Sequence, residues 1–134
     1  MAVEWNEKLA VGVHELDDQH KELFRAFNDL IQACQEDRAE GQIEDLLKFL
    51  DDYTRHHFAQ EEKLMRGHGY PASQFHNKEH EVFILRLQNL KKEMSEGGPS
   101  RALVFQTTRI LLKWIITHIK QVDLELGRYI RSRQ

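Results

Sequence analysis

The sequence is poor in the residues that cross-link or interrupt a small protein. It contains one cysteine, Cys34, and two prolines in 134 residues. A single cysteine excludes an intramolecular disulfide framework and fits a reducing cytosol, where we expect Cys34 to be an inert, partly buried thiol. We therefore expect a cytoplasmic protein whose stability comes from its core. Because prolines are so few, the breaks between helices are easy to locate.

Long hydrophobic runs and a strong charge of one sign are also missing. No apolar run approaches the roughly 18 residues of a membrane span, and the N-terminus lacks the pattern of a signal peptide. The formal net charge is −3, and no block of Lys and Arg is long enough to indicate nucleic-acid binding. We expect neither a membrane span nor a nucleic-acid partner. The length and the 40% of hydrophobic residues suit one domain with a substantial core.

Four amphipathic segments account for most of the chain. Apolar residues at helical spacing predict helices over about 17–35, 42–65 and 72–95, and from about 100 onward. The breaks are EDRAEG, RGHGYP and EGGP, and we expect Pro71 at the start of the third helix. No segment alternates strictly as a strand does. The sequence predicts an all-α fold, an antiparallel up-down-up-down four-helix bundle from about residue 16 onward.

The first 13 residues, MAVEWNEKLAVGV, have no helical stripe. We expect them to form an extended arm laid over the bundle, with Trp5 packed against helix ends. The whole chain, residues 1–134, is then predicted to be a single domain.

Histidine is the one residue type in marked excess, with eight in the chain. Five of them, and one glutamate, occupy positions in the apolar stripes where a bundle needs hydrophobic side chains: His20, His57, Glu61, His76, His80 and His118. Each unpartnered buried polar group would cost about 1–3 kcal/mol, against a total stability of about 5–15 kcal/mol. A lone histidine in a stripe is usually a hydrogen-bonded core residue, but five on four helices predict a metal site. We expect the others, His14 in the arm, His56 off the stripe and His68 in the loop, to be solvated or to lie behind the metal ligands.

The spacing of these residues suits chelation. Residues four apart lie on one helix face, so His57 with Glu61 and His76 with His80 can each converge on one ion. His118 and Asp123 are five apart and diverge on a regular helix. Both can serve one site only if the helix widens between them, and we therefore predict a π-helical turn there.

The donor set restricts the metal. Structural zinc sites usually use cysteine, and calcium and magnesium prefer oxygen ligands. Imidazoles mixed with carboxylates favour iron, while manganese, copper and zinc remain open. Seven ligands are too many for one ion but suit two irons, with Glu61 and Asp123 bridging them beside an oxo or hydroxo bridge from solvent. One iron then has three histidines and is closed, and the other has two histidines and an open position.

The motifs that carry these ligands resemble those of a known family. DDQH, HFAQEEKLM, GYPASQFHNKEH and WIITHIKQVD are similar in order and spacing to the motifs of bacterial hemerythrins, and VEWNEKLAVGV resembles the family's arm. The resemblance implies a non-haem di-iron protein that binds dioxygen reversibly as a carrier, store or delivery protein, and that is not an enzyme. It also implies the distribution of ligands: His76, His80 and His118 on the closed iron, His20 and His57 on the open iron, and Glu61 and Asp123 as bridges.

Several assignments around this centre stay open at the level of sequence. Ile116, Ile119 and Phe58 are expected to wall the oxygen pocket, although ordinary core packing explains them equally well. Asp17 either supports a ligand imidazole or caps a helix.

The function has alternatives too. An oxygen or redox sensor, or a di-iron enzyme acting on peroxide or nitric oxide, would use the same residues. Iron storage is disfavoured because two ions fill the ligand set. The absence of any Glu-x-x-His motif, typical of oxygen-activating di-iron bundles, favours reversible binding. The protein that would receive the oxygen is not identified by the sequence.

Overall fold

The computed structural model describes residues 4–133, and within that range every regular element is helical. Two single-turn 3₁₀ helices, η1 (Glu7–Leu9) and η2 (Ala39–Gly41), accompany three long helices, α1 (His14–Gln35), α2 (Ile43–His68) and α3 (Ser73–Gly97). The fourth rod alternates between α and π geometry as α4 (Arg101–Thr107), η3 (Thr108–Leu112), α5 (Lys113–His118), η4 (Ile119–Asp123) and α6 (Leu124–Ser132).

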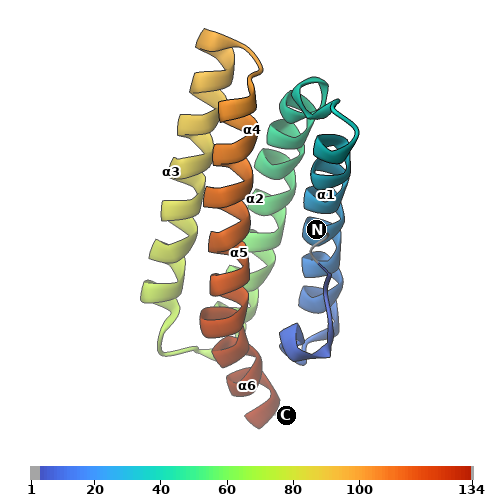
Figure 1. Cartoon of the computed structure of the whole chain (residues 1–134). Coiled ribbons are helices and arrows are strands. Elements are labelled where there is room, and N and C mark those ends of the chain that lie inside the picture. The colour runs from blue at the N-terminus through green and yellow to red at the C-terminus, as the bar shows by residue number, and fades with distance from the viewer. Residues whose placement is uncertain (1–3, 134) are drawn as a thin grey trace.

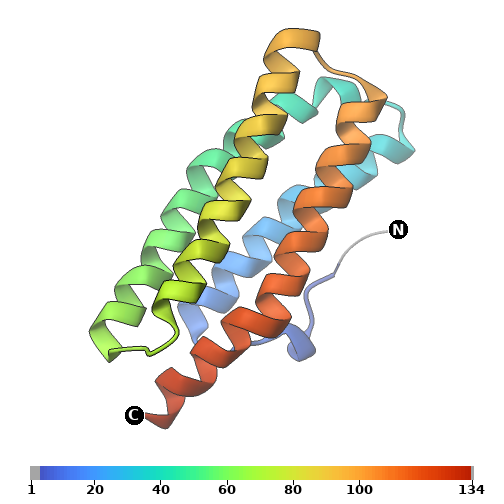
Figure 2. The ribbon, with the colours of Figure 1, turned by 90° about the vertical axis from the view of Figure 1, so that its left-hand side faces the viewer.

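The four rods lie side by side, and each runs opposite to the one before it (Figures 1 and 2). The predicted all-α, up-down-up-down bundle is therefore confirmed. No helix in the described range is both long and apolar enough to cross a membrane.

Local chemistry explains where the helices end. α2 stops at Gly69, which adopts φ 61, and the N–H of Tyr70 bonds back to the carbonyl of Met65 at 3.0 Å. Glycine adopts this left-handed conformation without steric cost, which makes it a common helix terminator. α4 starts after Ser100, whose hydroxyl accepts a hydrogen bond from the N–H of Leu103 at 3.0 Å. Pro71 does not start the third helix as expected, because that helix begins at Ser73 and the proline lies in the preceding turn.

The apolar stripes predicted from the sequence form the core. The largest fully buried side chains include Phe24, Phe27 and Phe83, with leucines from all four rods around them. The buried histidines and acidic residues come from the first half of α1, the second half of α2, the first half of α3 and the second half of the fourth rod. Because the rods are antiparallel, these four halves lie at the same end of the bundle, where α2 turns into α3.

The fourth rod contains the π-helical turn that we predicted. η4 covers Ile119–Asp123, immediately after His118, so that prediction is confirmed. A second π segment, η3 at Thr108–Leu112, was not predicted. A π turn holds more residues than an α turn, which lets side chains five apart share one face.

The N-terminal arm is less extended than expected, because it contains η1. Trp5 is half-buried against the core, and the Lys21 ammonium lies 4.5 Å from its ring centroid. Val11 is fully buried, and the arm lies beside the end of the fourth rod (Figure 2). Residues 1–3 of the predicted arm lie outside the described range.

Asp17 holds this arm in place, which is neither of the two roles considered for it. One carboxylate oxygen accepts the N–H of Val11 at 2.8 Å, and the other accepts the N–H of Gly12 at 3.3 Å. The helix already begins at His14, so Asp17 is not its cap.

Three further expectations were wrong. His14 belongs to the first turn of α1 rather than to the arm, and His68 to the last turn of α2 rather than to the loop. Cys34 is exposed rather than partly buried, because it lies near the end of α1 on the outer face.

Candidate metal centre

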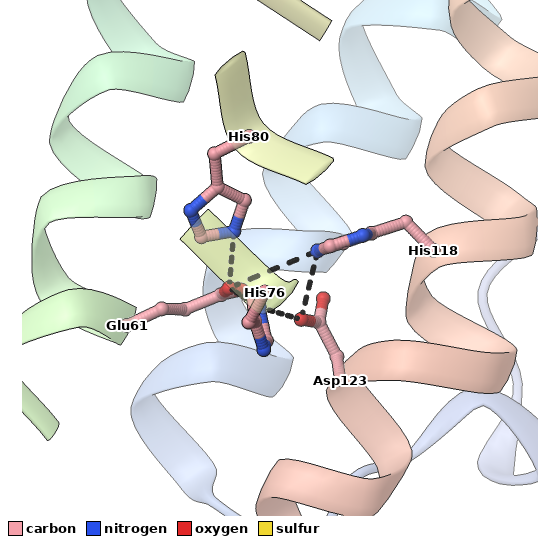
Figure 3. A group of neighbouring side chains, drawn as sticks. All are labelled: Glu61, His76, His80, His118 and Asp123. Carbon is pink, nitrogen blue, oxygen red and sulfur yellow. Dashed lines mark hydrogen bonds and ion pairs between the residues drawn. The ribbon is translucent and has the colours of Figure 1, made fainter. Parts of the chain in front are cut away.

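Seven polar side chains meet inside the bundle, and none is more than 3% exposed. α1 contributes one of them, α2 two, α3 two and the fourth rod two: His20, His57, Glu61, His76, His80, His118 and Asp123. Figure 3 shows five of them converging from three rods. These are the seven residues proposed as ligands from the sequence, and the fold brings all of them together.

The carboxylate of Glu61 lies between two groups of imidazoles. Its Oε1 is 2.8 Å from His57 Nε2 and 3.7 Å from His20 Nε2. Its Oε2 is 2.8 Å from His76 Nε2 and 2.9 Å from His80 Nε2. Each oxygen therefore faces a different group.

Asp123 repeats this division from the opposite rod. Its Oδ2 is 3.1 Å from His20 Nε2. Its Oδ1 is 3.1 Å from the Nε2 atoms of both His76 and His118. The position of Asp123 depends on the π turn of η4, because a regular helix would turn it away from His118.

The site consequently has two halves that share both carboxylates. The first, which we call the three-histidine half, contains His76, His80 and His118, and the second, the two-histidine half, contains His20 and His57. In each half the candidate ligand atoms, with those of Glu61 and Asp123, all lie within 4.8 Å of one another. Each half has the size and the donor types of a site for one cation.

The electrostatics show how strongly the site attracts positive charge. Burial disfavours a charged imidazole, but Asp123 and Glu61 outweigh it and raise the pKa of His20 and His76 to about 9. The same balance raises the pKa of His118 to about 10. The pKa values of both carboxyl groups lie below their usual range, because the neighbouring imidazoles outweigh the effect of burial. Burial lowers the pKa of His57.

Hydrogen bonding among these residues leaves several buried atoms unsatisfied. His118 Nε2, Glu61 Oε1 and both oxygens of Asp123 make no hydrogen bond within the described part of the chain. Buried polar atoms normally have such partners, and atoms without them indicate a missing ion or water. A cation in each half would satisfy these lone pairs, so the residues present fit a pair of metal ions.

The outward ring nitrogens of two candidate ligands have hydrogen-bond partners, and that of a third faces a more distant carboxylate, none of which the sequence analysis identified. His57 Nδ1 lies 2.5 Å from Gln19 Oε1, His80 Nδ1 lies 3.1 Å from Glu62 Oε2, and His118 Nδ1 lies 3.9 Å from Glu79 Oε1. Each partner is the sequence neighbour of a candidate ligand. That was the available signal, but such residues are common on exposed helix faces.

Aromatic rings stack on the faces of two of the imidazoles. Phe58 stacks on His80 with ring centroids 3.8 Å apart, and Trp114 stacks on His118 at 4.4 Å. These contacts limit rotation of the rings and direct their Nε2 atoms into the centre.

A small cavity of about 10 Å³ adjoins the two-histidine half. Besides the candidate ligands His20, His57, His118 and Asp123, it is lined by Leu23, Thr54, Phe58, Trp114, Ile115 and Ile119. Phe58 and Ile119 thus lie where the pocket wall was expected. Ile116 does not line this cavity: it is half-buried, because Ile115, three residues before His118, takes the inward position.

The remaining histidines lie away from the centre. His14 is exposed and pairs with Asp18 at 3.1 Å, and His56 is exposed on α2. The backbone carbonyl of His68 accepts a hydrogen bond from Tyr129.

Comparison with known proteins agrees with this geometry. The family model described as the Hemerythrin HHE cation binding domain matches residues 11–130. A bacteriohemerythrin of Pseudomonas paraeruginosa is 32% identical over 119 residues, which cover 89% of this chain and 75% of that protein. A myohemerythrin of Theromyzon tessulatum is 30% identical over 124 residues, which cover 91% and 88%. A solved hemerythrin structure with a leucine-to-tyrosine substitution superimposes with a TM-score of 0.84 at 30% identity, covering 97% of this chain and 98% of that one.

Proposed function

The chain belongs to the hemerythrin family of cation-binding domains, and on that premise we propose that it binds dioxygen reversibly at a pair of iron ions. The observation that carries the proposal is the division of the site. Glu61 and Asp123 each direct one carboxylate oxygen to the three-histidine half and the other to the two-histidine half. Two carboxylates placed in this way hold two ions side by side. We also propose that residues 1–134, the arm included, form one hemerythrin-like domain.

The proposed ligand assignment follows the two halves. His76, His80 and His118 would hold one iron, His20 and His57 the other, and Glu61 and Asp123 would be shared by both. The distances from the imidazole Nε2 atoms to Glu61 Oε1 and Oε2 support this division. Because the two-histidine half offers one protein ligand fewer, an ion held there would have room for a small molecule. Iron, rather than another metal, is proposed because imidazoles mixed with carboxylates suit it.

Two ferrous ions would supply the two electrons that dioxygen accepts when it binds and returns when it leaves. The side chains of the protein make the binding cavity small and keep water out of it. The cavity beside His20 and His57 holds about 10 Å³, close to the smallest space for one water-sized molecule. Its non-ligand lining is apolar apart from Thr54, whose hydroxyl donates to the backbone carbonyl of Leu50. That proton is therefore directed away from the cavity.

The size of the cavity favours a binding protein over an enzyme acting on organic substrates. A cavity of about 10 Å³ has room for about one water-sized molecule and is too small for an organic substrate. Peroxide and nitric oxide are also small, so cavity size does not separate an enzyme that acts on them from an oxygen carrier. The enzyme would consume its substrate over repeated turnovers, whereas a carrier would not. A sensor would bind oxygen in the same way and differ in its partner.

The test is an oxygen titration of the anaerobically reduced, iron-loaded protein, followed by visible absorbance with iron analysis. We expect two irons per chain and a charge-transfer band that appears with oxygen and fades on deoxygenation. The variant His118→Ala should lose the band, and His56→Ala, a histidine exposed on the same bundle, should keep it. One-way oxidation, or consumption of peroxide or nitric oxide under turnover, would contradict the carrier function.

A further inference from the structure

The two halves of the metal centre are supported by chemically different groups. In the three-histidine half, carboxylates lie beyond the imidazoles: Glu62 is 3.1 Å from His80 Nδ1, and Glu79 is 3.9 Å from His118 Nδ1. In the two-histidine half, a neutral amide takes that place, with Gln19 Oε1 2.5 Å from His57 Nδ1. The difference between a charged and a neutral acceptor coincides with the difference in ligand number.

The acceptor behind a ligand imidazole changes how the imidazole binds metal. All five imidazoles direct Nε2 toward the shared carboxylates, so Nδ1 is the nitrogen left to carry the proton. When Nδ1–H donates to a carboxylate, the ring becomes a stronger base and its orientation is fixed. An amide oxygen has the same effect more weakly, because it carries no net charge.

Glu62 is well placed for this role. It follows Glu61 in α2, its side chain is 35% exposed, and it lines a surface groove between α2 and α3 that also reaches His80. The His80 ring is held on one face by Phe58, with centroids 3.8 Å apart, and at its Nδ1 edge by Glu62. Glu79 lies too far from His118 for a hydrogen bond and adds only its charge to the same half.

We propose that Glu62 and Gln19 are positioning residues that make the two metal positions unequal. Glu62 strengthens the hold of the three-histidine half on its ion and favours the higher oxidation state there. Gln19 orients His57 without adding charge, so the two-histidine half holds its ion less tightly and stays ferrous more easily. This inference rests on the proposed di-iron centre and extends it to residues outside the ligand set.

Cobalt(II) is a probe that needs neither oxygen nor redox chemistry. We would add it to the full-length metal-free protein against a competing chelator and follow its visible ligand-field absorbance. For the wild type we expect two binding steps, the tighter one at the three-histidine half. Replacing a partner of this kind typically costs 10–100-fold in metal affinity, so Glu62→Gln should weaken the tighter step by about that factor and leave the other unchanged.

The reverse substitution, made in the two-histidine half, should raise metal affinity rather than lower it. Gln19→Glu places a carboxylate behind His57 and should tighten the weaker cobalt step. Glu81→Gln is the matched control, since Glu81 lines the same groove as Glu62 but is exposed and lies outside the metal cluster. A merely structural role would not tighten any step. An unchanged tighter step in Glu62→Gln, or an equal loss in Glu81→Gln, would overturn the proposal.

The iron-loaded protein gives a second readout, the reduction potential of each one-electron step. Glu62→Gln should raise the potential of the three-histidine iron, by about 59 mV for each tenfold loss of preference for the ferric state. Gln19→Glu should lower the potential of the two-histidine iron. If the cobalt steps behave as expected but oxygen binds irreversibly, the proposed function fails and the positioning roles stand. If the cobalt steps do not respond, the positioning roles fail whatever oxygen does.

Discussion

The backbone carbonyl of Val11 lies directly against Gly127. A Cβ built on this glycine would be 1.9 Å from the carbonyl oxygen and 2.9 Å from the carbonyl carbon. Only a residue without a side chain allows the arm to approach α6 so closely. Gly127 lies four residues beyond Asp123 in the fourth rod, so the arm packs against the same stretch of helix that places Asp123 in the candidate metal centre.

This contact predicts that Gly127→Ala will destabilise the fold. The methyl group cannot fit without moving the backbone, and such overpacking costs about 1–3 kcal/mol. The measurement is urea unfolding of the metal-free protein. Gly97→Ala is the matched control, because a Cβ at Gly97 in α3 meets nothing within 4 Å. Alanine there should be neutral or stabilising. Equal stability of the two variants would mean that the arm does not dock as described.

Asp17 gives a second prediction about the arm. Asp17→Ala removes the acceptor for the N–H groups of Val11 and Gly12 and should cost about 1–3 kcal/mol. Hydrogen exchange at these two amides should become faster. Asp18→Ala serves as the control, because its carboxylate is 53% exposed and pairs with the surface groups His14 and Lys21. Such pairs contribute little, so exchange in the arm should stay as in the wild type. Unchanged exchange in Asp17→Ala would contradict the anchoring role.

Iron retention should separate the buried histidines from the exposed ones. His118→Ala removes a nitrogen 3.1 Å from Asp123 Oδ1 and should lower iron affinity by more than the roughly 10-fold of an outer contact. Both variants are passed through gel filtration in a buffer that contains a chelator. His56→Ala should retain its iron in this step, because His56 is exposed. Iron analysis per chain checks both. Equal losses would show that the stripe assignment in α2 and the fourth rod is wrong.

The metal-free protein should lose stability as the pH rises. The pKa values of His20 and His76 are raised to about 9 and that of His118 to about 10, above the 6.5 of an unfolded chain. Their charged forms therefore stabilise the fold fully below pH 6.5, and this contribution is lost as the pH rises through 9 to 10. Urea midpoints at pH 7 and pH 10, with chelator present, measure the loss.

The metal-loaded protein is the control for that experiment. Its ligand histidines are neutral and bound to metal at both values, so its midpoint should fall less over the same range. Loading at pH 7 should also release protons into an unbuffered solution. Identical pH dependence with and without metal would mean that these imidazoles do not give up protons to the ions.

The bundle and the location of its polar centre could be predicted because both follow from helical periodicity. Stripes of apolar residues gave the four rods, and histidines within them identified the centre. Even the π turn could be predicted, since His118 and Asp123 cannot meet on a regular helix. The bounds shifted by a few residues, as at the start of α1, which is His14 rather than about residue 17, and at the start of α3, which is Ser73 rather than about residue 72.

What escaped prediction depends on contacts between segments far apart in the chain. Nothing near Gly127 in the sequence indicates that Val11 will lie against it. Asp17 looked like a cap or a support for an imidazole, because its real partners are backbone N–H groups that carry no sequence signal. Ile115 and Ile116 are identical side chains, and only the exact rotation of the rod decides which one faces the cavity.

The π turn at Ile119–Asp123 has a consequence for how sequences of this kind can change in length. Each residue advances an α-helix by about 100°, and the π turn takes up one residue more than an α turn while the residues after it stay on the same face. Deleting one residue within this turn would restore a regular helix with Asp123 four residues after His118, still on the same face. A one-residue deletion in the regular helix between Asp123 and Gly127 would instead rotate Gly127 by about 100°, away from the arm. The π turn is therefore a place where this rod can lose a residue and keep both its metal-centre contact and its arm contact.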